Sequence, residues 1–297
     1  MTNITRRYLA GSLAALLGTG LLMTADVPLF AQINNYYELP EGYYEVVVSR
    51  NVMVPMRDGV RMATDVYLPA RDGIAVPGQF PTLLSRTPYG KNGSDQTARG
   101  LASNGYAVAI QDTRGRYESE GTFYIYVHEG RDGYDAVEWA AAQPWSNGDV
   151  GTFGGSYLAA TQMAMAVEAP PNLKAMFIRV GTSNYWEDGS GSGGAFALLH
   201  NLGYALNLVT TSQEAQADPA RQRALVSARE PDNFREWIRA YPFYPNTSLF
   251  ELIPTYHRWF QDWVDHADFD DYWKQNGYTF ELSYDQIILD RFSDFAN

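Results

Sequence analysis

The sequence predicts an α/β fold, in which a mostly parallel sheet carries an N-terminal β-hairpin and an inserted helical cap. Three observations support this fold class. Strand-like and helix-like segments alternate from residue 80 to residue 180. Two β-rich segments joined by an Asp-Gly turn precede the alternation, and mainly helical periodicity follows residue 184. Such alternation places parallel strands in one sheet with helices on both faces.

The N-terminal hairpin is expected between residues 44–54 and 60–68. The first segment is rich in Val and Tyr, and the second alternates apolar and polar residues. Asp58-Gly59 favours a tight turn between them. Residues 69–78 contain Pro and Gly and are expected to form a loop.

The alternating region supplies the rest of the sheet. Short apolar runs suited to buried parallel strands cover residues 80–85, 106–111, 150–153 and 173–180. Helix-like segments between and after them cover residues 94–104, 131–143 and 157–168. We therefore assign residues 40–183 to the N-terminal part of the α/β core.

The pattern changes at Asn184. Residues 189–194 read as a Gly/Ser loop, and the segments beyond it have the apolar spacing of amphipathic helices, at 198–208, 221–229, 231–240 and 257–264. We interpret residues 184–281 as a helical cap inserted into the core. Residues 282–297 form a truncated or divergent tail in this division.

The first 31 residues resemble an export signal. Arg6 and Arg7 precede an uncharged run from Leu9 to Met23, and Ala31 is one possible cleavage point. The run is shorter than a typical membrane span, although an uncleaved anchor helix is the alternative. The Arg6-Arg7 pair also resembles a twin-arginine signal. We expect a periplasmic or secreted protein with no stable membrane insertion once the signal is removed.

Composition excludes several classes of function. The formal net charge is −12 and the sequence pI is about 4.7, which argues against nucleic acid and anionic membranes as partners. Cysteine is absent, so disulfides, Cys-ligated metals and thiol nucleophiles are excluded. No cofactor is expected, and the oligomeric state is not indicated. The high aromatic content, 14%, suits either an aromatic-lined pocket or ordinary packing.

Ser156 is the candidate nucleophile. Residues 152–159 have the strand–Gly-x-Ser–helix form of a nucleophile elbow, in which small neighbours make room for a strained serine. Gly154 provides that room, and the backbone N–H of Tyr157 at the start of the helix is suited to stabilising an oxyanion. Leu158 departs from the strict pattern, which expects a small residue. The alternative is a serine that only caps the helix.

Four ordered segments carry a resemblance to a known family. They are Val54–Val60, Arg86–Lys91 with its Pro-Tyr pair, Gly105–Arg116 with Ser119-Glu120-Gly121, and Gly154–Ala159. Together they resemble the cocaine-esterase-like and X-prolyl dipeptidyl-peptidase-like serine hydrolases, which have an α/β-hydrolase fold. That family usually has Gly at the position of Ala159. The resemblance covers roughly residues 45 to 200.

The resemblance implies roles for further residues. The Tyr89 hydroxyl is expected in the oxyanion hole beside the Tyr157 N–H, since a phenol donates without changing charge. Glu187 and Asp188 lie where the amino-ester hydrolases of this family have an acidic site for an α-amine. They are otherwise solvated loop charges.

A base and an acid for Ser156 are not evident. In this fold the acid and then the His follow the nucleophile in the chain. We expect the four histidines to serve as surface or packing residues: His128, His200, His257 and His266. Residues 269–274 resemble the end of the family's cap, and the surroundings of Asp290 and Asp294 do not match the triad acid. We therefore expect a C-terminally truncated or frame-disrupted chain, with the final strands, the triad acid and the triad His absent.

The expected activity is hydrolysis of an ester or amide bond through an acyl-enzyme on Ser156. The substrate is expected to be a small ester, an amide or a short peptide, as in X-Pro dipeptidyl-peptidases. The alternative is a catalytically inactive fragment or a binding protein that keeps the hydrolase fold.

Overall fold

A computed structural model of the protein describes residues 43–239 and 253–280. The export signal expected over 1–31 and the tail over 282–297 lie outside these residues. The predicted N-terminal hairpin is confirmed, because β1 (Glu45–Pro55) pairs antiparallel with β2 (Arg61–Arg71). A short strand, β3 (Ile74–Ala75), pairs with the end of β2 inside the segment predicted as a loop.

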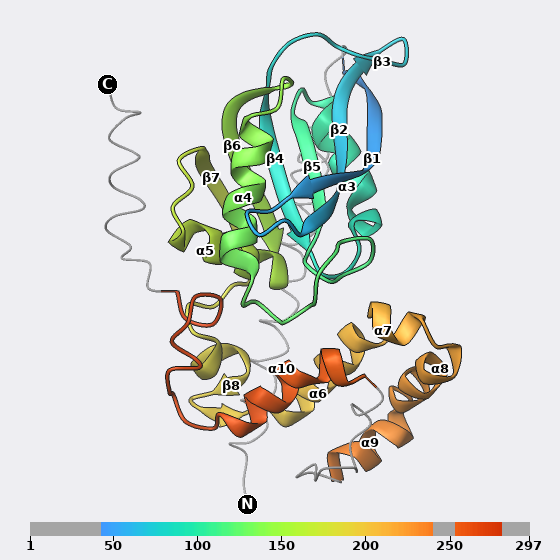
Figure 1. Ribbon diagram of the computed structural model, residues 1–297, viewed down its shortest axis with the longest axis vertical. Coiled ribbons are helices and arrows are strands. Elements are labelled where there is room, and N and C mark those ends of the chain that lie inside the picture. The colour runs from blue at the N-terminus through green and yellow to red at the C-terminus, as the bar shows by residue number, and fades with distance from the viewer. Residues whose placement is uncertain (1–42, 240–252, 281–297) are drawn as a thin grey trace, which may run out of the picture. The chain divides into compact units, whose positions relative to one another are not determined.

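Strands β4, β5, β6 and β7 form the parallel part of one sheet (Figure 1). The sheet has the order β1-β2-β5-β4-β6-β7. In it β5 (Ala107–Asp112), β4 (Phe80–Thr87), β6 (Ser146–Gly155) and β7 (Leu173–Arg179) run parallel, while β2 pairs antiparallel with β5. The predicted mostly parallel α/β sheet is therefore confirmed.

Helices cover both faces of this sheet, as the contacts of β5 show. Val108 and Ile110 pack in a cluster with α3 (Asp95–Ser103), whereas Ala109 packs in a different cluster with residues of α4 (Glu129–Ala141) and α5 (Tyr157–Val167). Successive side chains of a strand point to opposite faces. Hence α3 lies on one face of the sheet and α4 and α5 lie on the other.

The segment after β7 is mainly helical. The four predicted helices are found with shifted bounds as α6 (Leu198–Val209), α8 (Pro219–Ala228), α9 (Pro231–Arg239) and α10 (Pro254–Asp265). The one-turn helix α7 (Gln213–Gln216) and the turn η2 (Tyr185–Gly189) were not predicted, and the turn η1 (Lys91–Ser94) lies earlier in the chain, before α3. The loop predicted over residues 189–194 is partly wrong. It contains β8 (Gly191–Ser192), which pairs with β9 (Ala195–Phe196) around two glycines with positive φ. Glycine adopts such angles without strain, which permits the tight turn.

Aromatic side chains form much of the core of this helical segment. Trp259, Phe260, Trp263, Trp273 and Tyr278 are each at most 2% exposed and belong to one hydrophobic cluster. Large rings bury much apolar surface each. Packing therefore accounts for part of the high aromatic content.

Strand β7 is an edge strand among the described residues, where β6 is its partner. Phe177 is 64% exposed and Val180, which follows the strand, is 88% exposed. Apolar side chains thus reach solvent at this end of the sheet. Within residues 43–239 and 253–280, no helix has both the length and the apolarity needed to cross a membrane.

Candidate active site

Ser156 occupies the sharp turn between β6 and α5. Its backbone has φ 58° and ψ −122°, a strained combination for a residue with a side chain. The Ser156 N–H donates to the carbonyl oxygen of Arg179 at 3.1 Å, which ties the turn to β7. The side chain makes no capping hydrogen bond to α5, although it precedes the helix. The geometry therefore matches the predicted elbow and not a helix-capping serine.

Gly154 makes this turn possible. Its φ is 148°, and a Cβ placed on it would lie 2.3 Å from the Cβ of Leu158 in the first turn of α5. Real Cβ atoms do not approach this closely, so a larger residue would push the helix away from the strand. The space needed for Leu158 thus comes from the glycine two residues before Ser156.

The structure brings Tyr89 to Ser156. The Tyr89 ring packs edge-to-face on that of Tyr157, the residue after Ser156, with centroids 6.2 Å apart, and the Tyr89 hydroxyl lies 3.1 Å from the hydroxyl of Tyr204. Burial raises the pKa of Tyr89 above its ordinary value of 10, against the opposing effect of the neighbouring Tyr204 and Ser156 hydroxyls. The phenol is therefore protonated at neutral pH and can act as an uncharged hydrogen-bond donor.

Tyr157 is the first residue of α5, so its amide belongs to the helix-terminal N–H groups that have no acceptor within the helix. Its side chain is fully buried. The Tyr157 hydroxyl donates to Glu129 Oε1 at 2.8 Å and accepts from the Tyr126 amide at 3.1 Å. These two bonds fix the residue whose amide was predicted to line the oxyanion hole.

The Glu129 contact is a functional feature that sequence reasoning missed. Glu129 is 3% exposed, and its other carboxylate oxygen accepts from Arg86 Nη1 at 2.6 Å. Burial raises the pKa of Glu129, while the charge of Arg86 opposes that rise. Glu129 was not considered because it lies far from Ser156 in sequence, at the start of a different helix.

The loop that carries Tyr89 is held through its backbone. The carbonyl oxygen of Pro88 accepts from Arg116 Nε at 2.8 Å, and that of Tyr89 accepts from the Tyr117 hydroxyl at 2.8 Å. The Tyr89 amide donates to Thr87 Oγ1 at 3.1 Å. The position of the phenol is therefore set by several bonds and does not depend on its ring alone.

A buried ion pair anchors the same loop. Lys91 donates to Asp112 through both its backbone amide, at 2.7 Å, and its Nζ, at 3.0 Å. Burial raises the pKa of Asp112 to about 6, even though Lys91 opposes that rise. Lys91 Nζ also pairs with Glu118 at 2.7 Å. Asp112 thus serves as an ion-paired anchor of this loop.

Glu187 and Asp188 lie on η2 and are solvent-exposed. Asn184 Oδ1 accepts from the Trp186 and Glu187 amides and begins this turn. Among the described residues, neither carboxylate has a hydrogen bond or ion pair, and no contact joins either to Ser156 or Tyr89.

The side chains of three histidines are described, and each has its own partners or surroundings. His200 is exposed and stacks on Tyr204, and His266 Nδ1 lies 2.6 Å from Asp270 Oδ2. Burial lowers the pKa of His128, which precedes α4. None of these three rings is hydrogen-bonded to Ser156. The side chain of His257, like Asp290 and Asp294, lies outside the described part of the structure.

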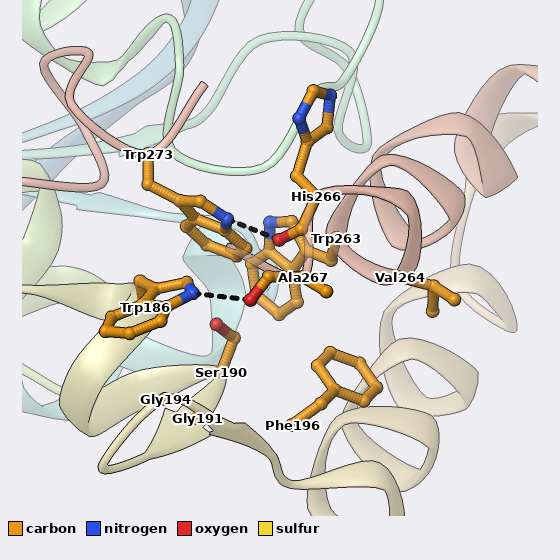
Figure 2. Close-up of a pocket in the computed structure, with 10 residues that line it drawn as sticks. All are labelled: Trp186, Ser190, Gly191, Gly194, Phe196, Trp263, Val264, His266, Ala267 and Trp273. Atoms are coloured by element: carbon orange, nitrogen blue, oxygen red, sulfur yellow. Dashed lines mark hydrogen bonds between the residues drawn. The ribbon is translucent and has the colours of Figure 1, made fainter. Parts of the chain in front are cut away.

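A small cavity of about 90 Å³ lies beside η2 and α10 (Figure 2). It is lined mainly by Trp186, Phe196, Trp263, His266 and Trp273. The indole nitrogens of Trp186 and Trp273 donate to the backbone oxygens of Ala267 and His266, at 3.0 and 2.7 Å. Neither Ser156 nor Tyr89 lines this cavity, so it is separate from the serine site. Over the described ranges, no group of three metal-ligating side chains is found.

Comparison with known proteins places these features in context. A sequence profile of the X-Pro dipeptidyl-peptidase (S15) family matches residues 58–288. The chain is 37% identical over 246 residues to cocaine esterase of Rhodococcus sp. (strain MB1 Bresler), a match that covers 79% of this chain and 41% of that protein. It is 31% identical over 143 residues to a putative serine esterase of Mycobacterium bovis, covering 41% of this chain and 22% of the relative.

Solved structures agree with the fold. A CocE/NonD family hydrolase from Staphylococcus aureus superposes with a TM-score of 0.56 at 26% identity, covering 80% of this chain and 39% of that one. An α-amino acid ester hydrolase gives a TM-score of 0.52 at 22% identity, covering 81% of this chain and 41% of that one. The chain thus spans about two fifths of the length of these relatives.

Proposed function

Because the chain belongs to the X-Pro dipeptidyl-peptidase (S15) family, we propose that it contributes a serine hydrolase site that cleaves an ester or amide bond through an acyl-enzyme on Ser156. One observation carries this proposal. Ser156 has a strained backbone, with φ 58°, at the strand–helix turn, and the ring of Tyr89 packs on Tyr157, the residue that follows it. A residue that only linked two elements would have no need of this strain.

The proposed reaction begins when Ser156 Oγ attacks the substrate carbonyl carbon. The carbonyl oxygen then gains negative charge and accepts hydrogen bonds from the Tyr89 hydroxyl and the Tyr157 N–H. Collapse of this intermediate expels the alcohol or amine and leaves an acyl group on Ser156, which water later removes. The serine proton must pass to a base, which returns it to the departing oxygen or nitrogen. Among the histidine side chains that the structure describes, His128, His200 and His266, none is bonded to Ser156, so the base is left unassigned.

We propose an ester as the preferred substrate, because the curated relatives described above carry esterase names. The competing class is a peptide or α-amino acyl compound. For that class Glu187 and Asp188 are the proposed partners of a substrate ammonium group, since both are exposed acidic side chains on η2. A small molecule is the proposed partner in both cases.

The experiment compares purified wild-type chain with Ser156→Ala on p-nitrophenyl butyrate and on alanyl-proline p-nitroanilide. We expect turnover of the ester that Ser156→Ala abolishes, and labelling of Ser156 by a fluorophosphonate in a mass spectrum. Glu187→Gln and Asp188→Asn should affect the anilide only. Equal ester turnover by wild type and Ser156→Ala would contradict the assignment.

A second candidate function is a binding protein that keeps the hydrolase fold without turnover. It is favoured by the lack of a hydrogen bond between Ser156 and His128, His200 or His266. The fluorophosphonate separates the two functions, because only an activated serine reacts with it. An unlabelled Ser156 in a folded chain would support the binding protein.

We further propose that the protein is exported to the periplasm or secreted, on the basis of Arg6, Arg7 and the apolar run that follows them. Replacing both arginines with lysine should retain the protein in the cytoplasm of a bacterial host, as shown by cell fractionation. Unchanged export of Arg6→Lys/Arg7→Lys would reject the twin-arginine route.

A further inference from the structure

Tyr204 touches the same hydroxyl that faces the proposed nucleophile. The two phenol oxygens of Tyr204 and Tyr89 lie 3.1 Å apart, and the Tyr89 ring packs on Tyr157, the residue after Ser156. Tyr204 lies on α6 and is separated from Tyr89 by 115 residues of sequence. Two hydroxyl groups from distant segments therefore form a hydrogen-bonded series beside the proposed nucleophile.

The number of protons available fixes the direction of this series during reaction. A phenol has one proton to donate and can accept through its lone pairs. If Tyr89 directs its proton at a developing oxyanion, it has none left for Tyr204. The bond between the two tyrosines must then be donated by Tyr204 and accepted by Tyr89. A donor of this kind also polarises the Tyr89 hydroxyl and strengthens the bond that Tyr89 gives.

The surroundings of Tyr204 are aromatic. Tyr204 packs against the buried cluster that contains Tyr126 and Tyr185. The rings of Tyr126 and Tyr185 stack with centroids 4.2 Å apart. The Tyr204 ring is thus held in place by packing while its hydroxyl meets that of Tyr89.

The backbone of α6 is tied to the Tyr89 loop by a second connection. The buried guanidinium of Arg116 donates to the Pro88 carbonyl oxygen at 2.8 Å, to the Leu208 carbonyl oxygen at 2.9 Å and to Thr211 Oγ1 at 2.7 Å. Pro88 precedes Tyr89, and Leu208 lies one turn beyond Tyr204. One side chain thus holds the two segments that carry the paired phenols.

We propose that Tyr204 is a positioning residue of the oxyanion hole, which donates a hydrogen bond to Tyr89 and so turns the Tyr89 proton toward the substrate oxygen. This role rests on the proposed function of Ser156 and Tyr89. It goes beyond that function because it assigns part of the catalytic geometry to a helix outside the sheet.

The test is Tyr204→Phe in the full chain, with p-nitrophenyl butyrate as the substrate. We expect kcat to fall about 5- to 10-fold, the effect of one neutral hydrogen bond of ordinary strength. KM should stay within about twofold, because the bond acts mainly in the transition state. The matched control is Tyr124→Phe, which removes a hydroxyl bonded to Asp262 and Tyr272 without touching Tyr89. We expect its kcat to match the wild type.

A double-mutant cycle with Tyr89→Phe separates positioning from general loosening of the structure. In the Tyr89→Phe background, Tyr204→Phe should lower kcat by less than about a further twofold. An equal loss in both backgrounds would overturn the proposal, and so would an equal loss in Tyr124→Phe or a rise in KM with kcat intact.

A readout without turnover completes the test. In protein labelled with [13Cζ]tyrosine, Tyr204→Phe should raise the titration midpoint of Tyr89, because its phenolate loses a donor. An unchanged midpoint would overturn the pairing. If the wild-type chain shows no turnover that depends on Ser156, the proposed function fails and the catalytic role of Tyr204 fails with it. If turnover is present and Tyr204→Phe matches the wild type, only the role of Tyr204 is rejected.

Discussion

Replacing Tyr89 with Phe removes one hydroxyl from the proposed oxyanion hole and little else. The ring should keep its place, because it packs edge-to-face on Tyr157 with centroids 6.2 Å apart and its loop is held by the bonds of Arg116 and Tyr117. The Tyr157 N–H remains as the second donor. The substitution therefore isolates the contribution of a single hydrogen bond to the transition state.

The expected loss is about 10²–10³ in kcat, the range found when one oxyanion donor is removed, which corresponds to about 2.7–4 kcal/mol. The loss of stability should be smaller. Among the described residues the hydroxyl is hydrogen-bonded to Tyr204, and Tyr89 is 38% exposed, so about 1 kcal/mol is expected. The loss in transition-state stabilisation should therefore exceed the loss in folding stability by about 1.7–3 kcal/mol.

The assay is steady-state hydrolysis of p-nitrophenyl butyrate beside a thermal unfolding curve for each protein. KM should change little, since the bond strengthens only as charge develops on the substrate oxygen. A raised KM with kcat intact would mean that Tyr89 binds the ground state. A rate loss matched by a loss of several kcal/mol in stability would mean that the hydroxyl is structural.

Three further predictions follow from the geometry. Ser156→Ala should lower the rate by at least about 10³ and abolish acyl-enzyme in a mass spectrum, and retained acyl-enzyme would exclude Ser156 as the nucleophile. Gly154→Ala should destabilise the fold by about 2–4 kcal/mol in denaturant unfolding, because Gly154 has a positive φ and the added Cβ would clash with α5. The control is Gly59→Ala. Gly59 also has a positive φ, but the added Cβ would have nothing within 4 Å, so this substitution should cost less. The Asp112 carboxyl should titrate near pH 6 by NMR, and at a higher pH in Lys91→Met. Because the pKa of Asp112 is raised from 3.8 in the folded state, its contribution to stability is present at low pH and is lost as pH rises through about 6. A titration midpoint near 4 would refute this prediction.

Local patterns explain what the sequence could predict. The β1–β2 hairpin followed from alternation and an Asp-Gly turn, and the junction at Ser156 followed from a strand, a glycine and a helix in succession. Each depends on residues within about ten positions. Periodicity and turn chemistry are sufficient for such features.

The contacts that hold the site cross the fold and could not be predicted in this way. Glu129 meets the Tyr157 hydroxyl across 28 residues, and Tyr204 meets Tyr89 across 115. Neither pair has a characteristic spacing, and this chain has 21 tyrosines. Only the packing of α4 and α6 decides which hydroxyls come together. The position of Glu187 and Asp188 on the turn η2 could likewise not be predicted from the sequence pattern.

Strand β7 bears on how this protein behaves in concentrated solution. Among the described residues its outer edge leaves backbone groups without a strand partner, and Phe177 and Val180 add exposed apolar surface. An edge of this kind is a template for pairing between molecules. The net charge of −12 opposes such pairing by repulsion, which added salt screens over about 10 Å at 0.1 M. Self-association should therefore increase with both protein concentration and ionic strength, which sets dilute, low-salt buffer as the condition for every measurement above.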